Sequence, residues 1–208
     1  MTRDDAASLL IDTTLAMAAS GVPLMRRILP ADMPQRLWDH YPAQDIVAPG
    51  GSRCFYHSHP PDARGDGEQG HFHLFLPRRA MPDPAAPWLS PTVGVAAEHD
   101  AVHLIALSVD RSGIPRSAFT TNRWVTGEWL FDARSIIAAM TRFDLRGAGG
   151  DALVNAWLTA AVAIARPLIG DLLTARDVAL SLHDPGGEDR SVEILSSAPF
   201  DLQVLLDG

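Results

Sequence analysis

Hydrophobic residues recur every three or four positions in three segments of the chain, and this spacing predicts helices. The first segment covers residues 4–29, where Gly21 and Pro23 are candidate breaks. The second covers residues 132–143 and begins with an aspartate suited to capping a helix. The third, over residues 151–169, carries a broad apolar stripe typical of a core helix.

Shorter apolar runs bounded by Pro and Gly predict strands. Strands and helices do not alternate regularly, so the pattern predicts an α+β fold. We expect a mostly antiparallel sheet of about six short strands packed with about three helices. The last two strands are expected to form a hairpin around the turn at residues 184–187. The expected strands are residues 53–59, 71–76, 102–109, 118–125, 178–182 and 191–195.

The length of 208 residues suits one domain. We divide it into an N-terminal helix (4–29), a Pro-rich loop and His-bearing strand region (30–91), and a region of sheet and helices (92–208). The middle region holds 11 of the 16 prolines, so loops and short strands are expected there. The prediction is therefore a single domain over residues 1–208.

All 17 basic residues are arginine, and no lysine occurs. Enzymes that need a Schiff-base lysine, a P-loop lysine or a kinase lysine are excluded. The formal net charge of -8 argues against nucleic acid as a partner. Arginine without lysine, together with much alanine, indicates a GC-rich bacterial source.

Cellular location is predicted from three further features. The chain has one cysteine, so no disulfide can form within it. Acidic residues near the N-terminus argue against a signal peptide. No apolar run reaches the roughly 20 residues that cross a bilayer. We expect a cytoplasmic protein with no membrane partner.

Half of the eight histidines lie within one short window, as two His-x-His pairs. The pairs are His57 with His59 and His71 with His73. At this histidine content, about 0.3 such pairs are expected by chance in the whole chain. Side chains alternate along a strand, so each pair should present both imidazoles on one face.

We expect the two histidine strands to pair antiparallel, with His59 opposite His71 and His57 opposite His73. The four imidazoles could then converge on one divalent transition metal ion, with zinc or non-haem iron the best match. Glu68, in the linking segment, is the candidate fifth ligand or general base. The other acidic residues of that segment are Asp62 and Asp66.

Three resemblances involve these residues. Gly51-x5-His57-x-His59 is similar to the opening of the first cupin motif, although Arg64 occupies a position where that motif continues with Glu. The run His57-Ser-His-Pro60 resembles the signature of metal-dependent deubiquitinase-like peptidases, whose following Ser and Asp correspond to Gly67 and Gly70. Residues 56–60 together with 70–75 resemble an uncharacterised bacterial domain family, which implies no activity.

Other polar residues are secondary candidates. Arg123 could orient a carboxylate substrate, or could form a salt bridge with Glu128 or another neighbour. His103 could join the histidines if its strand lies beside theirs, although a strand-end position is favoured. Cys54 is out of phase with the histidines and should face the opposite side. His40, His99 and His183 are assigned to solvated loops.

Three functions follow from this pattern. The favoured one is a metal-dependent hydrolase or oxygenase that acts on a small molecule through a His-ligated zinc or iron ion. The first alternative is a non-catalytic module that binds haem, a metal or a small ligand. The second is a structural or partner-binding domain whose histidines are satisfied by internal hydrogen bonds.

Overall fold

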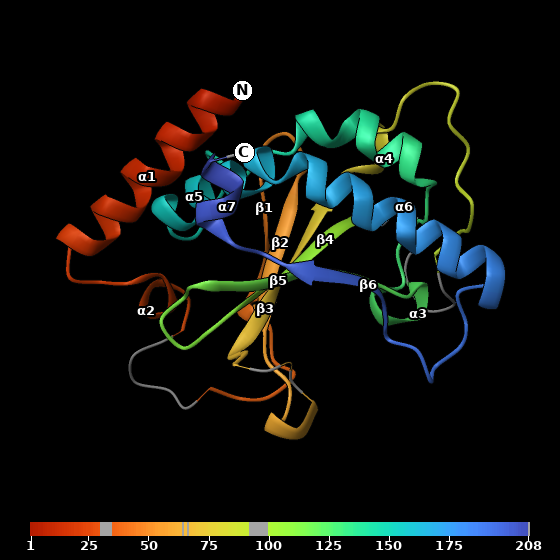
Figure 1. Ribbon diagram of the computed structural model, residues 1–208, viewed down its shortest axis with the longest axis horizontal. Helices are drawn as coiled ribbons and strands as arrows, with labels where there is room; N and C mark the ends of the chain where they lie inside the picture. Colours follow the sequence, from red (N-terminus) through yellow and green to blue (C-terminus); the bar gives the residue numbers. More distant parts are fainter. Residues whose placement is uncertain (30–34, 64, 66, 92–99, 208) are drawn as a thin grey trace.

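One antiparallel sheet runs through the protein, and its six strands lie side by side in chain order (Figure 1). The computed structural model describes residues 1–29, 35–63, 65, 67–91 and 100–207. Every strand pairs antiparallel with its neighbour in sequence. The strands are β1 (Tyr41–Val47), β2 (Arg53–His57), β3 (Gly70–Leu76), β4 (Val102–Val109), β5 (Pro115–Thr121) and β6 (Ile194–Pro199).

The described residues also form seven α-helices, which confirms the α+β class. Short 3-10 helices follow β2, β3 and α4, at Pro61–Ala63, Arg78–Ala80 and Met140–Arg142. The helices are α1 (Arg3–Ala19), α2 (Leu24–Ile28), α3 (Arg123–Thr126), α4 (Ala133–Ala139), α5 (Ala152–Ile164), α6 (Arg166–His183) and α7 (Leu202–Asp207).

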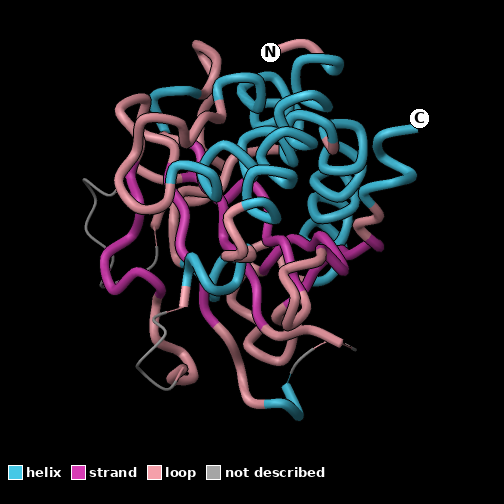
Figure 2. Tube along the Cα trace, turned by 90° about the vertical axis from the view of Figure 1, so that its left-hand side faces the viewer, coloured by secondary structure: helices cyan, strands magenta, loops and turns pink. Residues whose placement is uncertain are grey.

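The longer helices gather on one side of the sheet (Figure 2). Helix α1 packs on α5, while α4 packs on α6 and α6 contacts β6. Buried Val154 and Leu158 of α5 face the sheet and help to line a cavity of about 100 Å³. Cys54, Tyr56 and Phe72 line this cavity from β2 and β3. Together with Leu74, which pairs with Cys54 in the ladder, these three residues mark the helix-covered face.

The alternate residues of the same strands point the other way. Phe55, His57, His71 and His73 therefore share the opposite surface of β2 and β3, which we call the His-bearing face. Cys54 lies on the helix-covered face, as its position in the sequence predicts. Burial there raises the pKa of its thiol to about 12, with a smaller contribution from Asp45.

Several predicted elements agree with the structure. The N-terminal helical segment is broken between α1 and α2, where Gly21 and Pro23 interrupt it. Asp132 caps α4 by accepting a hydrogen bond from the backbone of Ser135. Asp151 caps α5 in the same way.

Two predicted elements were wrong and one strand was missed. Residues 178–182 belong to α6 rather than to a hairpin, because Pro167 suits the first turn of a new helix that continues to His183. The strand predicted over residues 118–125 ends at Thr121, where Asn122 caps α3. Strand β1 was missed, since this edge strand exposes much of its length and contains a proline.

Among the described residues, no single helix is long and apolar enough to cross a membrane. Helices α5 and α6 satisfy the length and composition criteria only when taken together, and they are bent by 71°.

The single-domain organisation stays a prediction.

Candidate metal centre

The His-bearing face gathers histidines from two strands and the loop after the first. His57 is the last residue of β2 and pairs directly with His71, while His73 pairs with Phe55. The expected pairing of His59 with His71 was wrong by two residues, because β2 ends at His57 and His59 lies in the following loop. A shift of two residues preserves the alternation, so the strand histidines still share one face.

The imidazole nitrogens converge at hydrogen-bonding distance. Nε2 of His57 lies 2.8 Å from Nε2 of His71 and 3.3 Å from Nε2 of His59. His57, His71 and His73, here called the His triad, each offer one ring nitrogen within 4.8 Å of the others. Four-coordinate zinc with bonds of about 2.0–2.1 Å places its ligand nitrogens roughly 3.3–3.4 Å apart. The triad is therefore close to the spacing that one small cation requires.

Burial favours the neutral imidazole, which is the form that binds metals. His73 is 1% exposed and His71 is 4% exposed. Burial, followed by repulsion from His71, His59 and His40, lowers the pKa of His57 to about 2. Burial also holds the pKa of His73 well below its usual value, with smaller contributions from the other histidines.

Aromatic rings enclose the histidines. The ring of Phe55 lies 5.0 Å from that of His73, and the ring of Phe119 lies 5.1 Å from that of His71, edge to face. Phe75 packs with Phe55 and Ala101 in a small apolar cluster on the same side. These rings lower the local dielectric and strengthen any charge interaction made by the nitrogens.

Glu68 contacts one histidine of the triad from behind. Its Oε1 lies 2.7 Å from Nδ1 of His71, and both side chains are largely buried. In the tautomer with the proton on Nδ1, His71 donates to Glu68 and directs the lone pair of its Nε2 toward His57. The contact gives Glu68 an orienting position, and its action as a fifth ligand or general base stays a prediction.

His103 makes the equivalent contact with a second member of the triad. Strand β4 lies beside β3, and Nε2 of His103 is 3.0 Å from Nδ1 of His73. Burial, with Arg176 and His71 as smaller influences, lowers the pKa of His103 to about 3. Nε2 of a neutral His103 can therefore accept a hydrogen bond from Nδ1–H of His73, which leaves the other nitrogen of His73 for an ion. The strand-end assignment of His103 thus missed its contact with the cluster.

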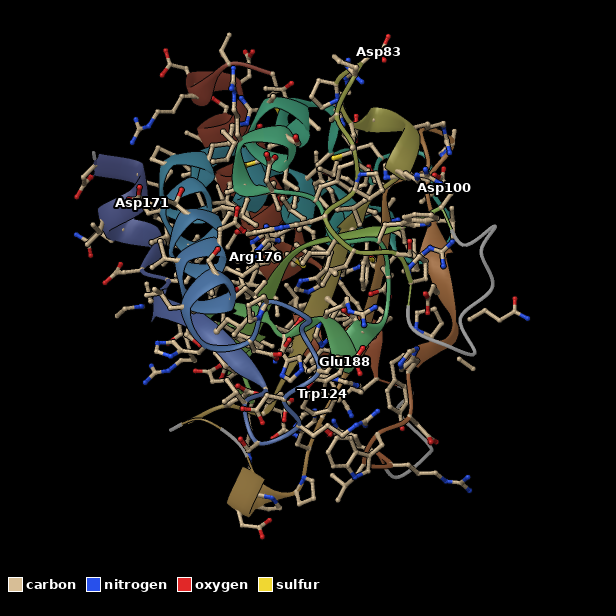
Figure 3. All side chains as sticks on the ribbon, turned by 90° about the vertical axis from the view of Figure 1, so that its right-hand side faces the viewer. Asp83, Asp100, Trp124, Asp171, Arg176 and Glu188 are labelled. Atoms are coloured by element: carbon tan, nitrogen blue, oxygen red, sulfur yellow. The ribbon has the colours of Figure 1, made fainter. Side chains whose placement is uncertain are left out.

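Arg123 is engaged by its neighbours. Its Nε and Nη1 donate to the carbonyls of Gly186 and Ser90 at 3.2 and 2.7 Å, and its Nη2 pairs with Glu188. Figure 3 shows Glu188 close to Trp124, the residue after Arg123. These contacts tie α3 to the loop after α6. Arg123 thus forms the salt bridge that was its alternative role, with Glu188 rather than Glu128 as the acid. A role in orienting substrate stays a prediction.

Sequence reasoning missed two residues beside the cluster. Trp38 places its ring 4.2 Å from that of His59. His40, assigned to a solvated loop, stacks on Phe55 at 3.7 Å and lies 3.2 Å from Asp45 through Nδ1. No local signal marks either residue, because their positions depend on how β1 meets β2.

Several other candidates lie elsewhere or cannot be placed. His183 is exposed, as predicted, but it is the last residue of α6 rather than part of a loop. Asp62 is exposed on the 3-10 helix after β2. His99, Arg64 and Asp66 lie outside the described residues.

Fold and site together define a class: an α+β protein with a histidine cluster built on one face of an antiparallel meander. The chain belongs to the family described as a domain of unknown function (DUF6969), whose family model matches residues 4–200. No curated protein and no solved structure matches the chain. The expected membership of an uncharacterised family is confirmed, and that membership carries no activity to this chain.

Proposed function

We propose that this protein binds one divalent transition metal ion through the His triad and uses it as an enzyme on a small molecule. The observation that carries the proposal is the convergence of three ring nitrogens within 4.8 Å. Zinc and iron(II) are the metals whose preference for imidazole matches this set. The enzyme would be a metal-dependent hydrolase or oxygenase.

The contacts behind the triad favour a metal over internally satisfied histidines. Glu68 and His103 both contact Nδ1 atoms, so the nitrogens left over on His71 and His73 are the ones available to an ion. Metal-bound histidines usually donate their second N–H to such a partner. The Nε2 atom of His71 faces that of His57 at 2.8 Å, on the side where an ion would bind.

Three protein ligands leave coordination positions open, which is the arrangement of catalytic zinc and non-haem iron sites. Bound zinc would supply an acidified water, and iron(II) would supply positions for oxygen and substrate. Glu68 and His103 contact the Nδ1 atoms of His71 and His73 and would orient these two imidazoles. His59, 3.3 Å from His57, is the residue that could fill a fourth position. A fourth protein ligand would favour the alternative of a metal-binding module without catalysis.

Haem is the weaker cofactor candidate. Haem iron binds one or two histidines on opposite sides of a flat macrocycle. Here the Nε2 atoms of His57 and His71 are 2.8 Å apart, which suits one small ion between them better than a porphyrin. The absence of a Soret band in the purified protein would agree with this choice.

The proposed partner is a small-molecule substrate in the cytoplasm. The net charge of -8 supports a partner other than nucleic acid or an anionic membrane surface. The same charge favours the accumulation of cations near the protein.

Metal analysis of protein purified without a His tag tests the proposal. We expect about one equivalent of zinc or iron per chain, since the triad forms one site. His71→Ala should lose this metal, while His183→Ala, which removes an exposed histidine, should keep it. Fewer than about 0.1 equivalent, with no uptake of added zinc, iron or cobalt, would overturn the proposal.

A further inference from the structure

Trp38 combines two features that are unfavourable for a tryptophan. It is 57% exposed, and its backbone φ is +70°. Among the described residues it is the only non-glycine with a positive φ. For a bulky side chain this conformation is an outlier that persists only where the surroundings impose it. Such outliers concentrate at binding and catalytic sites.

A chain of hydrogen bonds imposes the conformation. The backbone N–H of Trp38 donates to the carbonyl of Ser58 at 2.9 Å. The hydroxyl of Ser58 accepts a hydrogen bond from the side-chain amide of Gln35 at 2.7 Å. The side-chain carbonyl of Gln35 in turn accepts one from the side-chain amide of Gln69, also at 2.7 Å. Ser58 is fully buried and lies between His57 and His59 in the sequence. The segment carrying Trp38 is therefore fastened to the start of β3 and to the loop that holds His59.

The indole ring consequently lies at the border of the histidine cluster. Its centroid is 4.2 Å from that of His59, with 31° between the planes. The ring of His59 is in turn 4.9 Å from that of His57 and 5.0 Å from that of His71. A second flat surface, His40 stacked on Phe55, lies 5.8 Å from His57. Two aromatic surfaces thus lie next to histidines of the cluster, one beside His59 and one beside His57.

We propose that Trp38 is a specificity-determining residue of the metal centre. The substrate of the enzyme would then be a planar aromatic molecule that carries an oxygen or nitrogen donor. The donor would reach the metal while the ring lies against the indole. This inference rests on the proposed function, because the metal provides the anchor point. Aromatic stacking is specific for ring geometry, whereas metal coordination alone is not.

Two probes of similar donor set separate stacking from coordination. 4-Nitrocatechol and acetohydroxamate both bind metals through two oxygens, and only the first is a planar ring. Their binding to untagged, cobalt-loaded protein is followed by the cobalt visible spectrum. The variants are Trp38→Leu, Trp38→Phe and the matched control Trp88→Leu. Trp88 is 44% exposed and, within the described residues, makes no ring contact with a histidine.

We expect Trp38→Leu to weaken 4-nitrocatechol binding about three- to tenfold, the range that one aromatic stack supplies. Acetohydroxamate binding and cobalt affinity should be unchanged, Trp38→Phe should restore most of the loss, and Trp88→Leu should behave as wild type. Equal weakening of both probes, or of neither, would overturn this inference alone. Failure of the wild-type protein to take up cobalt would overturn the metal centre and this inference with it.

Discussion

The two faces of strands β2 and β3 are built from alternate residues of the same short segments, and they differ completely in chemistry. The helix-covered face is apolar: Tyr56, Phe72 and Leu74 pack toward α5. The His-bearing face holds three imidazoles, of which those of His71 and His73 are buried and that of His57 is half-buried. Apolar residues would serve both faces equally well for stability. The proposed metal site would account for polar rings buried on this face.

The largest effect is expected from a substitution that creates a cavity on the helix-covered face. Leu158→Ala, at a fully buried position, should lower the free energy of unfolding by about 2–5 kcal/mol. Urea denaturation measures this, with Leu182→Ala at a 70% exposed position as the control. Zinc stoichiometry should not change, because the substitution lies away from the triad. Loss of zinc binding in the folded variant would show that the two faces are not independent.

Glu128 tests how a buried carboxyl behaves when one of its two oxygens has no hydrogen-bond partner. It is 8% exposed, its Oε2 has no hydrogen bond among the described residues, and burial raises its pKa from 4.5 to about 7. The folded state therefore holds the proton more tightly than the unfolded state. Stability should be fully present below pH 4.5 and should fall as the pH rises through 7, by about 3 kcal/mol at most.

Glu128→Gln removes this titration while keeping the shape of the side chain. Urea unfolding of metal-free protein at a series of pH values across that window should show a falling free energy of unfolding in the wild type and a flatter profile in the variant. Identical slopes in the two proteins would mean that another group causes the dependence.

Removing the carboxylate behind the triad should weaken metal binding without abolishing it. Glu68→Ala should lower zinc affinity about 10- to 100-fold, because His71 loses the partner that orients it. Isothermal titration measures the affinity, and Asp62→Ala at an exposed position is the matched control. Complete loss of zinc would instead support Glu68 as a ligand, and an unchanged affinity would remove it from the site.

The smallest expected effect concerns His103. His103→Leu removes the acceptor for Nδ1 of His73 and should lower zinc affinity about tenfold. His103→Gln keeps an acceptor and should lose less than the leucine variant. Competition with a coloured zinc chelator is sensitive enough to resolve this difference. Equal losses in both variants would indicate a packing effect rather than an orienting hydrogen bond.

Features that depend on neighbouring residues in the chain could be predicted from the sequence, and features that depend on residues distant in the chain could not. The alternation of His57, His71 and His73 is a local property of strands, so their common face was predictable. The register was not, because the loop between β2 and β3 sets it and the chain leaves β2 two residues earlier than expected. Cluster members distant in sequence could not be derived for the same reason. His103 and Trp38 reach the site through tertiary packing alone.

Local patterns also misled in two places. The alternation of Val178, Leu180 and Leu182 resembles a strand, although only Leu180 of the three is buried in α6. Edge strand β1 lacks a clear apolar alternation because much of it faces solvent. Both errors lie outside β2 and β3, so the predicted histidine cluster was unaffected by them.

The central claim is that the His triad binds a metal ion directly. X-ray absorption at the zinc edge, recorded on untagged protein loaded with one equivalent of zinc, tests it most directly. The triad predicts three imidazole nitrogens at about 2.0–2.1 Å, or four if His59 also binds. His183→Ala should give the same spectrum, and His57→Ala should lose imidazole scattering. A wild-type spectrum with oxygen ligands alone would contradict the claim.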